Sequence, residues 1–554
     1  MASALPDDLS REDYDAWLAI ESFFDDAFYL SENSDVAVAG INARLHYLWA
    51  GWREGRDPSA DFSSDFYLAT NPDVAAAGIN PLLHYVWAGR FEGRLGKRPY
   101  DRVRKVMEAA IPSQEKAHFY ALNDDRAGLD TTRLVEVLSK VVVNGLIVST
   151  SHDDYGDNFG GVQRLLGEEQ AAFAAHGWAH LHLSPARPLP ILTNETDPGR
   201  FRFSARLAGQ FAGTFSAATL LETLRELHAH GATVEFVIHH FMGHSPEFIG
   251  AAIDAVPGAG VHFWVHDFYA LCPSYNLLRN DVAFCGGPPI HSMGCRICIY
   301  GTERVGHTDR IRMFFDRFNP VIIGPSETAL SVWKRGGLSH REAHVSPLAK
   351  IVQSEQTFQA PEHGPLRIAY VGAPLHHKGW HAFGDLVQRF GTDDRYRFYH
   401  FGEAPDGGGI PSAITAISVR AGVHDRDLMT RTIAEHGIDI VVMWPIWPET
   451  FCYAVHEALA AGSFVIARRD AGNVWPAIMN HAADQGAAFD TQKELFELFD
   501  EGRTLKAYAS RPRRRGLILP DLNSSHFVLP RHTAKRDFGF AEWGPLAGAE
   551  QANA

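Results

Sequence analysis

Two glutamates stand eight positions apart in the stretch WPETFCYAVHEALAAG, residues 447–462. Glu449 comes just before a helical run, and Glu457 lies about two turns along it. Backbone N–H groups at a helix start bind anions such as a diphosphate, because the helix dipole is positive there. Those groups belong to Phe451, Cys452 and Tyr453. Glu449 could then accept hydrogen bonds from sugar hydroxyls, and Glu457 could hold a diol such as ribose. The alternative is two ordinary acids of a helix start, stabilised by the dipole.

A second candidate anion site lies in RIAYVGAPLHHKGW, residues 367–380. The apolar strand pattern ends at Gly372, and Lys378 stands shortly before the next helical segment. Backbone N–H groups at that helix start could face a phosphate, and the ammonium group of Lys378 would neutralise it. Lysines beside helix starts are also common on protein surfaces. The prediction of an anion site at residues 367–380 therefore depends on the other candidate helix start, at residues 447–462.

Four of the five cysteines lie within 27 residues and end in a C-x2-C pair. They are Cys272, Cys285, Cys295 and Cys298. This spacing predicts a structural zinc site, with His291 as a further candidate ligand. The alternative is a set of reduced, partly buried cysteines in an irregular loop. In both cases the loop follows His266 and is expected to shape one side of a binding cleft.

The composition is that of a globular protein with two or three domains. The chain has 554 residues, of which 45% are hydrophobic and 21% charged. Lys and Arg number 51 against 66 Asp and Glu, and the net charge of −15 argues against nucleic acid as a partner. No apolar run approaches the roughly 20 residues of a membrane helix, and the start lacks a signal segment. We therefore expect a cytoplasmic protein, either free or peripheral at the inner membrane face.

The first hundred residues contain a duplication of 29 residues at an offset of 38. The copies cover residues 28–56 and 66–94, and the second carries helix start and stop signals at Asn71-Pro72 and Gly78. The pattern predicts a helical module whose aromatic residues form its own core. The alternative is a docking surface for a partner or an acceptor. Two repeats are few for an independent solenoid, so we expect the module to pack on the domain that follows.

Short apolar runs alternate with helical stretches after about residue 140, as in VEFVIHHF and NPVIIGPS. This alternation predicts an α/β protein whose parallel sheets are covered on both faces. We expect two doubly wound domains, at residues 138–350 and 351–515, with a ligand cleft between them. A helical domain over residues 1–137 precedes them. The tail, residues 516–554, is expected to pack back on the first α/β domain.

The stretch PETFCYAVHEALAAGSFVIAR resembles the E-x7-E region of retaining glycosyltransferases of the GT-B fold, in glycosyltransferase family 4. RIAYVGAPLHHKGW is similar to the strand, glycine and K-G segment of that family. NPVIIGPSETALSVWKRGG resembles the P-S-e element at the end of its first domain, and NFGGVQRLLGEEQAAFAAHGW resembles its opening Gly-Gly loop and helix. Together these stretches cover about residues 140–500 in the family's order.

The resemblance implies a GT-B fold that transfers a sugar from a nucleotide-diphosphate donor with retention of configuration and without a divalent metal. The catalytic residues it implies are His266, which would bond the transferred sugar, Lys378 and Glu449. The donor-binding residues it implies are Gly160, Gly161, Gly372, Phe451, Cys452, Tyr453 and Glu457. One departure from the family concerns Ala373, where an arginine is frequent. The candidates to replace that arginine are His376, His377 and Arg468.

The acceptor that the resemblance implies is a glycan or a lipid-linked glycan, as in the synthesis of bacterial surface polysaccharides and glycoconjugates. Two alternatives stay open. One is a nucleotide-sugar epimerase of similar two-domain shape. The other is a non-catalytic nucleotide-sugar-binding or scaffold protein that works through its repeats. Product formation from a labelled donor separates the three, whereas the sequence leaves the donor base, the sugar and the linkage open.

Overall fold

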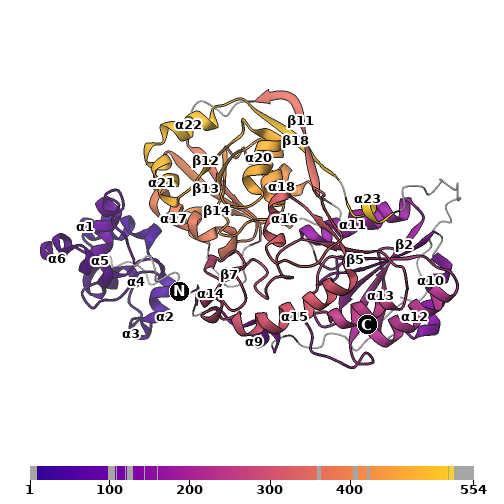
Figure 1. Ribbon diagram of the computed structural model, residues 1–554. Coiled ribbons are helices and arrows are strands. Elements are labelled where there is room, and N and C mark those ends of the chain that lie inside the picture. The colour runs from indigo at the N-terminus through magenta and orange to yellow at the C-terminus, as the bar shows by residue number, and fades with distance from the viewer. Residues whose placement is uncertain are drawn as a thin grey trace, which may run out of the picture.

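An N-terminal helical module and two α/β domains make up the protein, as the computed structural model shows (Figure 1). The structure describes residues 9–97, 106–107, 109–118, 120, 129–141, 144–158, 160–358, 364–403, 410–420, 425–521 and 523–529. The module lies beside the C-terminal α/β domain, and Gln388 of that domain donates a hydrogen bond of 3.2 Å to the carbonyl oxygen of Asp61.

The two sequence copies fold into the same succession of short helices. After α1 (Arg11–Ala19) and a 3-10 turn (Glu21–Phe23), the first copy forms α2 (Asp26–Glu32), α3 (Ser34–Ala39), α4 (Ala43–His46) and a π-helical turn (Tyr47–Gly51). The second copy forms α5 (Ser64–Thr70), α6 (Pro72–Ala77), α7 (Pro81–His84) and a π-helical turn (Tyr85–Gly89).

Equivalent side-chain contacts hold each copy together. The hydroxyl of Tyr29 lies 2.9 Å from Nδ1 of His46, and the hydroxyl of Tyr67 lies 2.8 Å from Nδ1 of His84. The repeated tyrosines Tyr29, Tyr47, Tyr67 and Tyr85 are buried in one core shared by the two copies. The core therefore explains why these tyrosines recur, whereas the repeated Trp49 and Trp87 are exposed.

The first α/β domain is built on an eight-stranded sheet with the order β10-β9-β6-β5-β1-β2-β3-β4. Its strands are β1 (Gly145–Thr150), β2 (Trp178–Pro185), β3 (Arg202–Leu207), β4 (Gln210–Ser216), β5 (Val234–Ile238), β6 (Val261–Trp264), β9 (Val321–Gly324) and β10 (Glu342–Val345). The pairs from β10 to β2 are parallel, and β3 and β4 add an antiparallel edge. The parallel strands β1, β2, β6 and β9 are buried along their whole length, as expected for a sheet covered on both faces.

The helices of this domain are α10 (Thr131–Val141), α11 (Gly161–Ala175), α12 (Ala217–Ala229), α13 (Pro246–Asp254), α15 (Gly301–Phe318) and α16 (Glu327–Lys334). Its smaller elements are α9 (Ser113–Ala117), β7 (Leu278–Arg279), β8 (Ala283–Phe284) and α14 (Met293–Arg296). The cysteine-containing segment that follows His266 forms the β7–β8 hairpin and α14. It lies on the side of the domain that faces the module (Figure 1).

The second α/β domain has a six-stranded sheet with the order β14-β13-β12-β15-β16-β17, and all its pairs are parallel. Its strands are β12 (Leu366–Val371), β13 (Tyr396–Phe401), β14 (Ile414–Ile417), β15 (Ile440–Met443), β16 (Phe464–Arg468) and β17 (Gly486–Phe489). Its helices are α17 (Trp380–Phe390), α18 (Leu428–Glu435), α19 (Tyr453–Ala460), α20 (Val474–Ala482), α21 (Gln492–Glu501) and α22 (Arg503–Ala509). The predicted α/β class with two parallel, doubly wound sheets is therefore confirmed.

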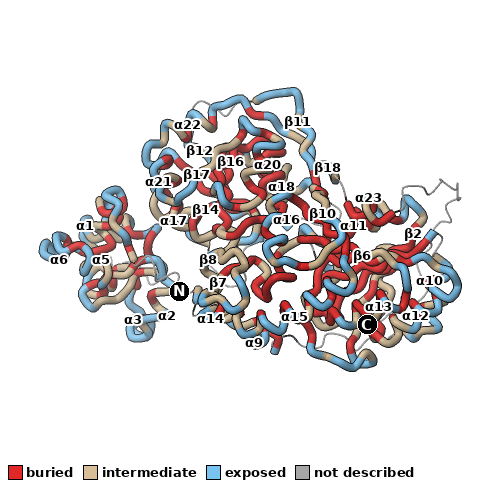
Figure 2. The backbone as a smooth tube through the Cα atoms, viewed as in Figure 1, coloured by how far each residue is buried: buried red, intermediate tan, exposed pale blue. Residues whose placement is uncertain are grey.

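Two long antiparallel strands connect the domains, β11 (Ala349–Phe358) and β18 (Arg513–Pro520). After β18 the chain returns to the first α/β domain, where α23 (Ser525–Val528) lies beside α11. Figure 2 shows that the buried segments concentrate in the two sheets, whereas the module has a thin core and much exposed backbone. In the part of the chain that the structure describes, no helix combines the length and apolar character needed to cross a membrane.

A buried ion pair fixes β18 to the second sheet. Nη1 of Arg513 donates to the carbonyl oxygen of Asp439 over 2.6 Å, and Nη2 lies 3.4 Å from Oδ1 of the same residue. The side chains are only 2% and 9% exposed. Oδ2 of Asp439 also accepts a hydrogen bond from the backbone N–H of Arg367, at the start of β12. The pair therefore links the returning strand to the entry points of β12 and β15.

We expect Arg513→Ala to lower the free energy of unfolding by about 3–5 kcal/mol, because it leaves the Asp439 carboxylate buried without its cation. The neighbouring residue Arg514 has an exposed side chain, so Arg514→Ala is the matched control and should change stability by less than about 0.5 kcal/mol. Urea denaturation of both variants measures the difference. Equal stability of the two variants would contradict a structural role for the pair.

Candidate functional site

A cavity of about 310 Å³ lies between the two α/β domains, at the carboxyl ends of β12 and β15. Its walls bring together segments that are far apart in the sequence. Eight of the ten site residues expected from the sequence line it: Gly161, His266, Gly372, Lys378, Glu449, Phe451, Cys452 and Tyr453. Gly160 and Glu457 are not among the lining residues. The position agrees with the general preference of α/β proteins for ligands at the carboxyl ends of strands.

The centre of this cavity is an ion pair between Lys378 and Glu449. Nζ of Lys378 lies 2.8 Å and 3.0 Å from the two carboxylate oxygens of Glu449. The indole N–H of Trp447 donates to Oε1 of Glu449 over 2.9 Å. Burial acts to lower the pKa of Lys378, but the Glu449 carboxylate outweighs it and raises that pKa above its ordinary value. Lys378 is therefore a firmly held cation at neutral pH.

Local backbone geometry positions both members of the pair. Gly379 has a φ of 90°, and a Cβ atom there would collide with the carbonyl group of Trp444, so the K-G turn can lie against the 443–447 segment only with glycine. Gly472 has a φ of 70° and lies directly against the backbone of Glu449. Gly472 was not among the site residues expected from the sequence, and its place in the D-A-G-N turn is the signal that could have identified it.

The start of α19 offers backbone N–H groups to the cavity. No side chain caps this helix, so its first-turn N–H groups lack an acceptor within the helix. Cys452 precedes the helix with a φ of 69°, in the left-handed region that few residues other than glycine adopt. Cys452, Tyr453 and Ala454 line the cavity at this point. The start of α19, where the sequence predicts an anion, therefore faces the cavity.

Residues of the first domain complete this wall. A Cβ atom on Gly161 would touch the ring of Tyr453 at 3.4 Å, so the Gly-Gly loop approaches α19 closely. The guanidinium of Arg164 lies 4.6 Å from the centroid of the same ring. Burial raises the pKa of Glu457 to about 7, and Arg164 acts in the opposite direction. Glu457 is therefore only partly ionised at neutral pH.

Thr450 is a direct link between the domains. Its hydroxyl donates to the carbonyl oxygen of His266 over 2.6 Å, and its own carbonyl oxygen accepts a hydrogen bond of 2.7 Å from the hydroxyl of Ser326. Ser326 belongs to the G-P-S-E stretch and also caps α16. These bonds hold the glutamate stretch against the carboxyl ends of β6 and β9 in the first domain.

His266 lies in a stack of aromatic rings. Its Nε2 is 3.0 Å from Nδ1 of His239, and its ring lies parallel to those of His239 and Trp264, at centroid distances of 5.3 Å and 5.4 Å. Burial first, and then the neighbouring His239, hold the pKa of His266 well below its ordinary value. His266 is therefore neutral at physiological pH and can offer the cavity a hydrogen bond rather than a charge.

Glu169 on α11 lies at the far end of this stack and is fully buried. Oε2 is 3.1 Å from Nε2 of His239, and Oε1 accepts hydrogen bonds from the indole N–H of Trp264 and from the backbone N–H and hydroxyl of Ser524. The carboxylate thus connects the C-terminal segment to the histidine in the cavity. Glu169 and His239 were not expected from the sequence. Glu169 lies in the stretch that resembles the family's opening helix, and His239 follows a strand, but no spacing pairs the two.

The four expected zinc ligands lie around one small cavity of about 20 Å³. Within the described residues, however, no three His, Cys, Asp or Glu side chains are arranged to hold a metal ion, so the expectation of zinc at Cys272, Cys285, Cys295 and Cys298 is wrong for this structure. The buried side chain of Arg304 organises the loop instead. It donates to Sγ of Cys295 over 2.9 Å and to the carbonyl oxygens of Leu271 and Pro288. A fixed cation among these sulfur atoms disfavours a second cation.

Several solved glycosyltransferase structures resemble the chain at low identity. The lipopolysaccharide outer core galactosyltransferase WaaB is 12% identical over 65% of this chain and 91% of its own, with a TM-score of 0.41. WaaG, a glycosyltransferase involved in lipopolysaccharide biosynthesis, is 14% identical over 66% and 93%, with a TM-score of 0.40. HepE of Anabaena, solved in complex with UDP-glucose, is 13% identical over 66% and 92%, with a TM-score of 0.37. At these values the likeness carries no conclusion about activity. No protein-family model and no curated protein matches the chain.

The Glu169 contacts make a testable contribution to stability. Burial acts to raise the pKa of Glu169, but His239 and Ser524 outweigh it, so the pKa is lower than usual in the folded protein. Such a carboxylate stabilises the fold above its unfolded pKa of about 4.3, and the effect is lost as the pH falls through the folded pKa. We expect Glu169→Gln to lower the free energy of unfolding by about 3 kcal/mol at pH 7.

The difference between wild type and Glu169→Gln should shrink when urea denaturation is repeated at successively lower pH below about 4. The exposed Glu226 on α12 supplies a matched control, since Glu226→Gln should remain within about 0.5 kcal/mol of wild type throughout. A Glu169→Gln penalty that stays the same at every pH would show that the ionised carboxylate is not the source of the stability.

Proposed function

We propose that the chain is a retaining glycosyltransferase that moves a sugar from a nucleotide-diphosphate donor to a glycan or lipid-linked glycan, in bacterial surface polysaccharide or glycoconjugate synthesis. The observation that carries the proposal is the arrangement of the interdomain cavity. A held cation, a carboxylate and an uncapped helix start meet there, on the segments that resemble family 4. A diphosphate linked to a sugar offers matching groups to all three.

The diphosphate would lie between Lys378 and the N–H groups of Cys452 and Tyr453. When the donor bond breaks, negative charge grows on the leaving diphosphate, and donors that are already in place stabilise it. The close approach of Gly161 leaves room for the same phosphates from the first domain. The absence of the frequent family arginine at Ala373 leaves Lys378 as the principal charge on this side.

The phosphate would compete with Glu449 for the ammonium group of Lys378. Glu449 would then be free to accept hydrogen bonds from hydroxyls of the donor sugar, while Trp447 still holds one carboxylate oxygen. The neutral ring of His266 would bond the same sugar from the first domain. Glu457, on α19 beyond the cavity lining, is our candidate for the ribose contact.

Transfer would proceed on one face of the sugar. The acceptor oxygen bonds to the anomeric carbon as the bond to the diphosphate breaks, and the bonding pair leaves with the diphosphate. A phosphate oxygen of the leaving group takes the proton of the acceptor hydroxyl. In this scheme Lys378 and the helix start do most of the catalytic work, because they act on the charge that develops.

We expect one nucleotide to raise the melting temperature of the wild-type protein in a thermal-shift panel of UDP, GDP, dTDP, CDP, ADP and their sugars. A ligand at about 100 times its dissociation constant stabilises a protein by roughly 2.7 kcal/mol. Lys378→Ala should weaken that binding by about 1.5–3 kcal/mol, the size of one charged hydrogen bond. A panel without any response in wild type would favour the scaffold alternative.

Glu449→Gln separates binding from transfer. The variant keeps the shape of the side chain and the bond from Trp447, but it loses the charge that we expect to orient the sugar. We expect transfer from a labelled donor to fall by at least about 100-fold, comparable with the loss of one preorganised transition-state contact. The nucleotide-induced thermal shift should persist, which shows that the variant is folded. Turnover at the wild-type rate would remove Glu449 from the mechanism.

A further inference from the structure

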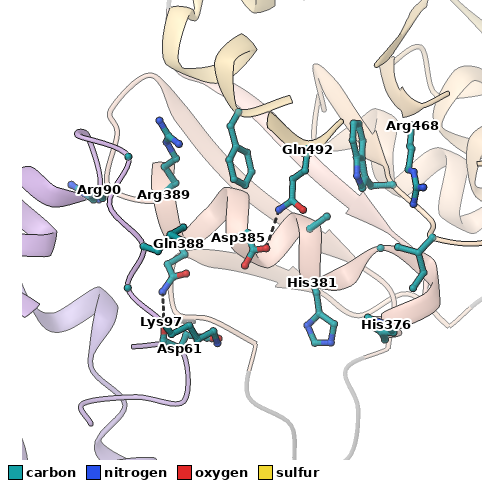
Figure 3. A pocket seen from close by; sticks show the side chains of 18 of the residues that line it. Asp61, Arg90, Lys97, His376, His381, Asp385, Gln388, Arg389, Arg468 and Gln492 are labelled. Atoms are coloured by element: carbon teal, nitrogen blue, oxygen red, sulfur yellow. Dashed lines mark hydrogen bonds and ion pairs between the residues drawn. The ribbon is translucent and has the colours of Figure 1, made fainter. Parts of the chain in front are cut away.

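A second and larger cavity, of about 610 Å³, lies between the helical module and the C-terminal domain (Figure 3). The segment 443–447 separates it from the interdomain cavity. Trp444 and Ile446 line the larger cavity, whereas Met443, Pro445 and Trp447 line the donor side. Its volume is within the usual range of ligand pockets, about 300–1,000 Å³. None of the residues to which the proposed function gives a donor contact lies in it. His376 and Arg468, which the sequence offered as replacements for the family arginine, line this cavity and not the donor cavity.

Both parts of the protein contribute polar groups to this cavity. Figure 3 shows Asp61, Arg90 and Lys97 of the module, and His376, His381, Asp385, Gln388, Arg389, Arg468 and Gln492 of the C-terminal domain. Rings of Tyr85, Trp444 and Phe496 form apolar parts of the wall. Such a lining suits a ligand that has many hydroxyls on an apolar ring. The amides and carboxylates can bond the hydroxyls, and the aromatic rings can pack against the apolar face of the ligand.

The lining carries more positive than negative charge, although the chain as a whole has a net charge of −15. Among the described lining residues, five are Arg or Lys and three are Asp. Four of the five cations already have carboxylate partners, in the pairs Arg94–Asp73, Lys97–Asp61, Arg389–Asp500 and Arg468–Asp470. The remaining cation is Arg90.

Among the described residues no carboxylate forms a close ion pair with Arg90, which is only 8% exposed. The carboxylate that acts on it electrostatically is Asp393, which is itself paired with Arg395. Nε donates to the carbonyl oxygen of Val86 over 2.9 Å, while Nη1 is buried without a hydrogen-bond partner. The rings of Phe23 and Phe91 lie 5.2 Å and 4.4 Å from its guanidinium carbon. A buried charge without a partner costs free energy, so its presence at a cavity indicates that an anion completes it.

The two repeat copies differ in the charge at the position of Arg90. At the position of Arg90 the first copy has Trp52, and at the position of Phe91 it has Arg53. In the first copy the tryptophan is buried and the arginine is exposed, with the guanidinium over the tryptophan ring. The second copy reverses the order and places the arginine inside. The repeat fold therefore does not require a charge at this position, and only the copy that borders the cavity has one.

We propose that the cavity between the module and the C-terminal domain binds an anionic saccharide, with Arg90 pairing with its carboxylate or phosphate group. The saccharide would be a distant part of the acceptor, held on the opposite side of the 443–447 segment from the donor. That last identification rests on the proposed glycosyl transfer, whereas the binding itself does not. Contact with His376 and Gly379 would place the bound sugar next to the turn that carries Lys378.

The test measures binding to the full chain by saturation-transfer NMR, with glucuronic acid, glucose 6-phosphate and glucose as probes. We expect at least one of the two anionic sugars to bind, and to bind more tightly than glucose. Whichever binds identifies a carboxylate or a phosphate as the natural group. Arg90→Gln should weaken this binding about tenfold or more, the effect of one charged hydrogen bond. Arg53→Gln, the equivalent arginine of the first copy, is the matched control and should bind like wild type.

A second variant guards against misfolding. The double substitution Arg90→Trp with Phe91→Arg recreates the order found in the first copy, so it should fold and keep the nucleotide-induced thermal shift while losing the anionic sugar. Lys378→Ala should keep the anionic sugar, which separates this site from the donor cavity. The proposal is overturned if neither anionic sugar binds, if the Arg90 variants bind like wild type, or if Lys378→Ala abolishes binding.

Discussion

The contact between Lys378 and Glu449 is the interaction on which the second domain's wall of the interdomain cavity depends. A carboxylate that is only 5% exposed needs a cation and hydrogen-bond donors, and here Lys378 and Trp447 supply them. The contact requires a close turn at Gly379, a backbone held by Gly472, and the inter-domain bonds of Thr450. Each of these features brings an end of a parallel strand to the same small volume. The buried charge and the contacts that satisfy it therefore lie at the centre of the cavity.

The first domain places a neutral histidine, His266, opposite the Lys378–Glu449 pair in the cavity. Its parallel strands carry buried histidines, and His266 reaches the cavity from a ring stack that ends at Glu169. Ser524, from the segment after β18, donates two hydrogen bonds to that carboxylate. The chain thus passes through both domains and returns to support the side chain that faces the cavity. Three consecutive contacts, Ser524 to Glu169, Glu169 to His239 and His239 to His266, link the C-terminal segment to the cavity.

The helical module illustrates how a duplication diverges where its surroundings differ. Both copies retain the tyrosine–histidine contact and the shared aromatic core, since these hold the repeat together. They differ in the exchanged pair at Trp52 and Arg53 against Arg90 and Phe91. The second copy meets the C-terminal domain and encloses a cavity with it. The buried charge appears in the copy that borders the cavity.

The sequence by itself determined the architecture and eight of the residues that line the interdomain cavity. Runs such as VHFW and IVVM indicate strands buried on both faces, and eight residues taken from ordered motifs line one cavity. Local pattern is sufficient there, because burial and helix starts are encoded in neighbouring residues. Only the tertiary structure decided the partners of buried charges: Arg304 among the cysteines, Glu169 beside His239, and Arg90 with one guanidinium nitrogen that lacks a hydrogen-bond partner. These depend on side chains up to hundreds of residues apart meeting in space, and no spacing in the sequence encodes such a meeting.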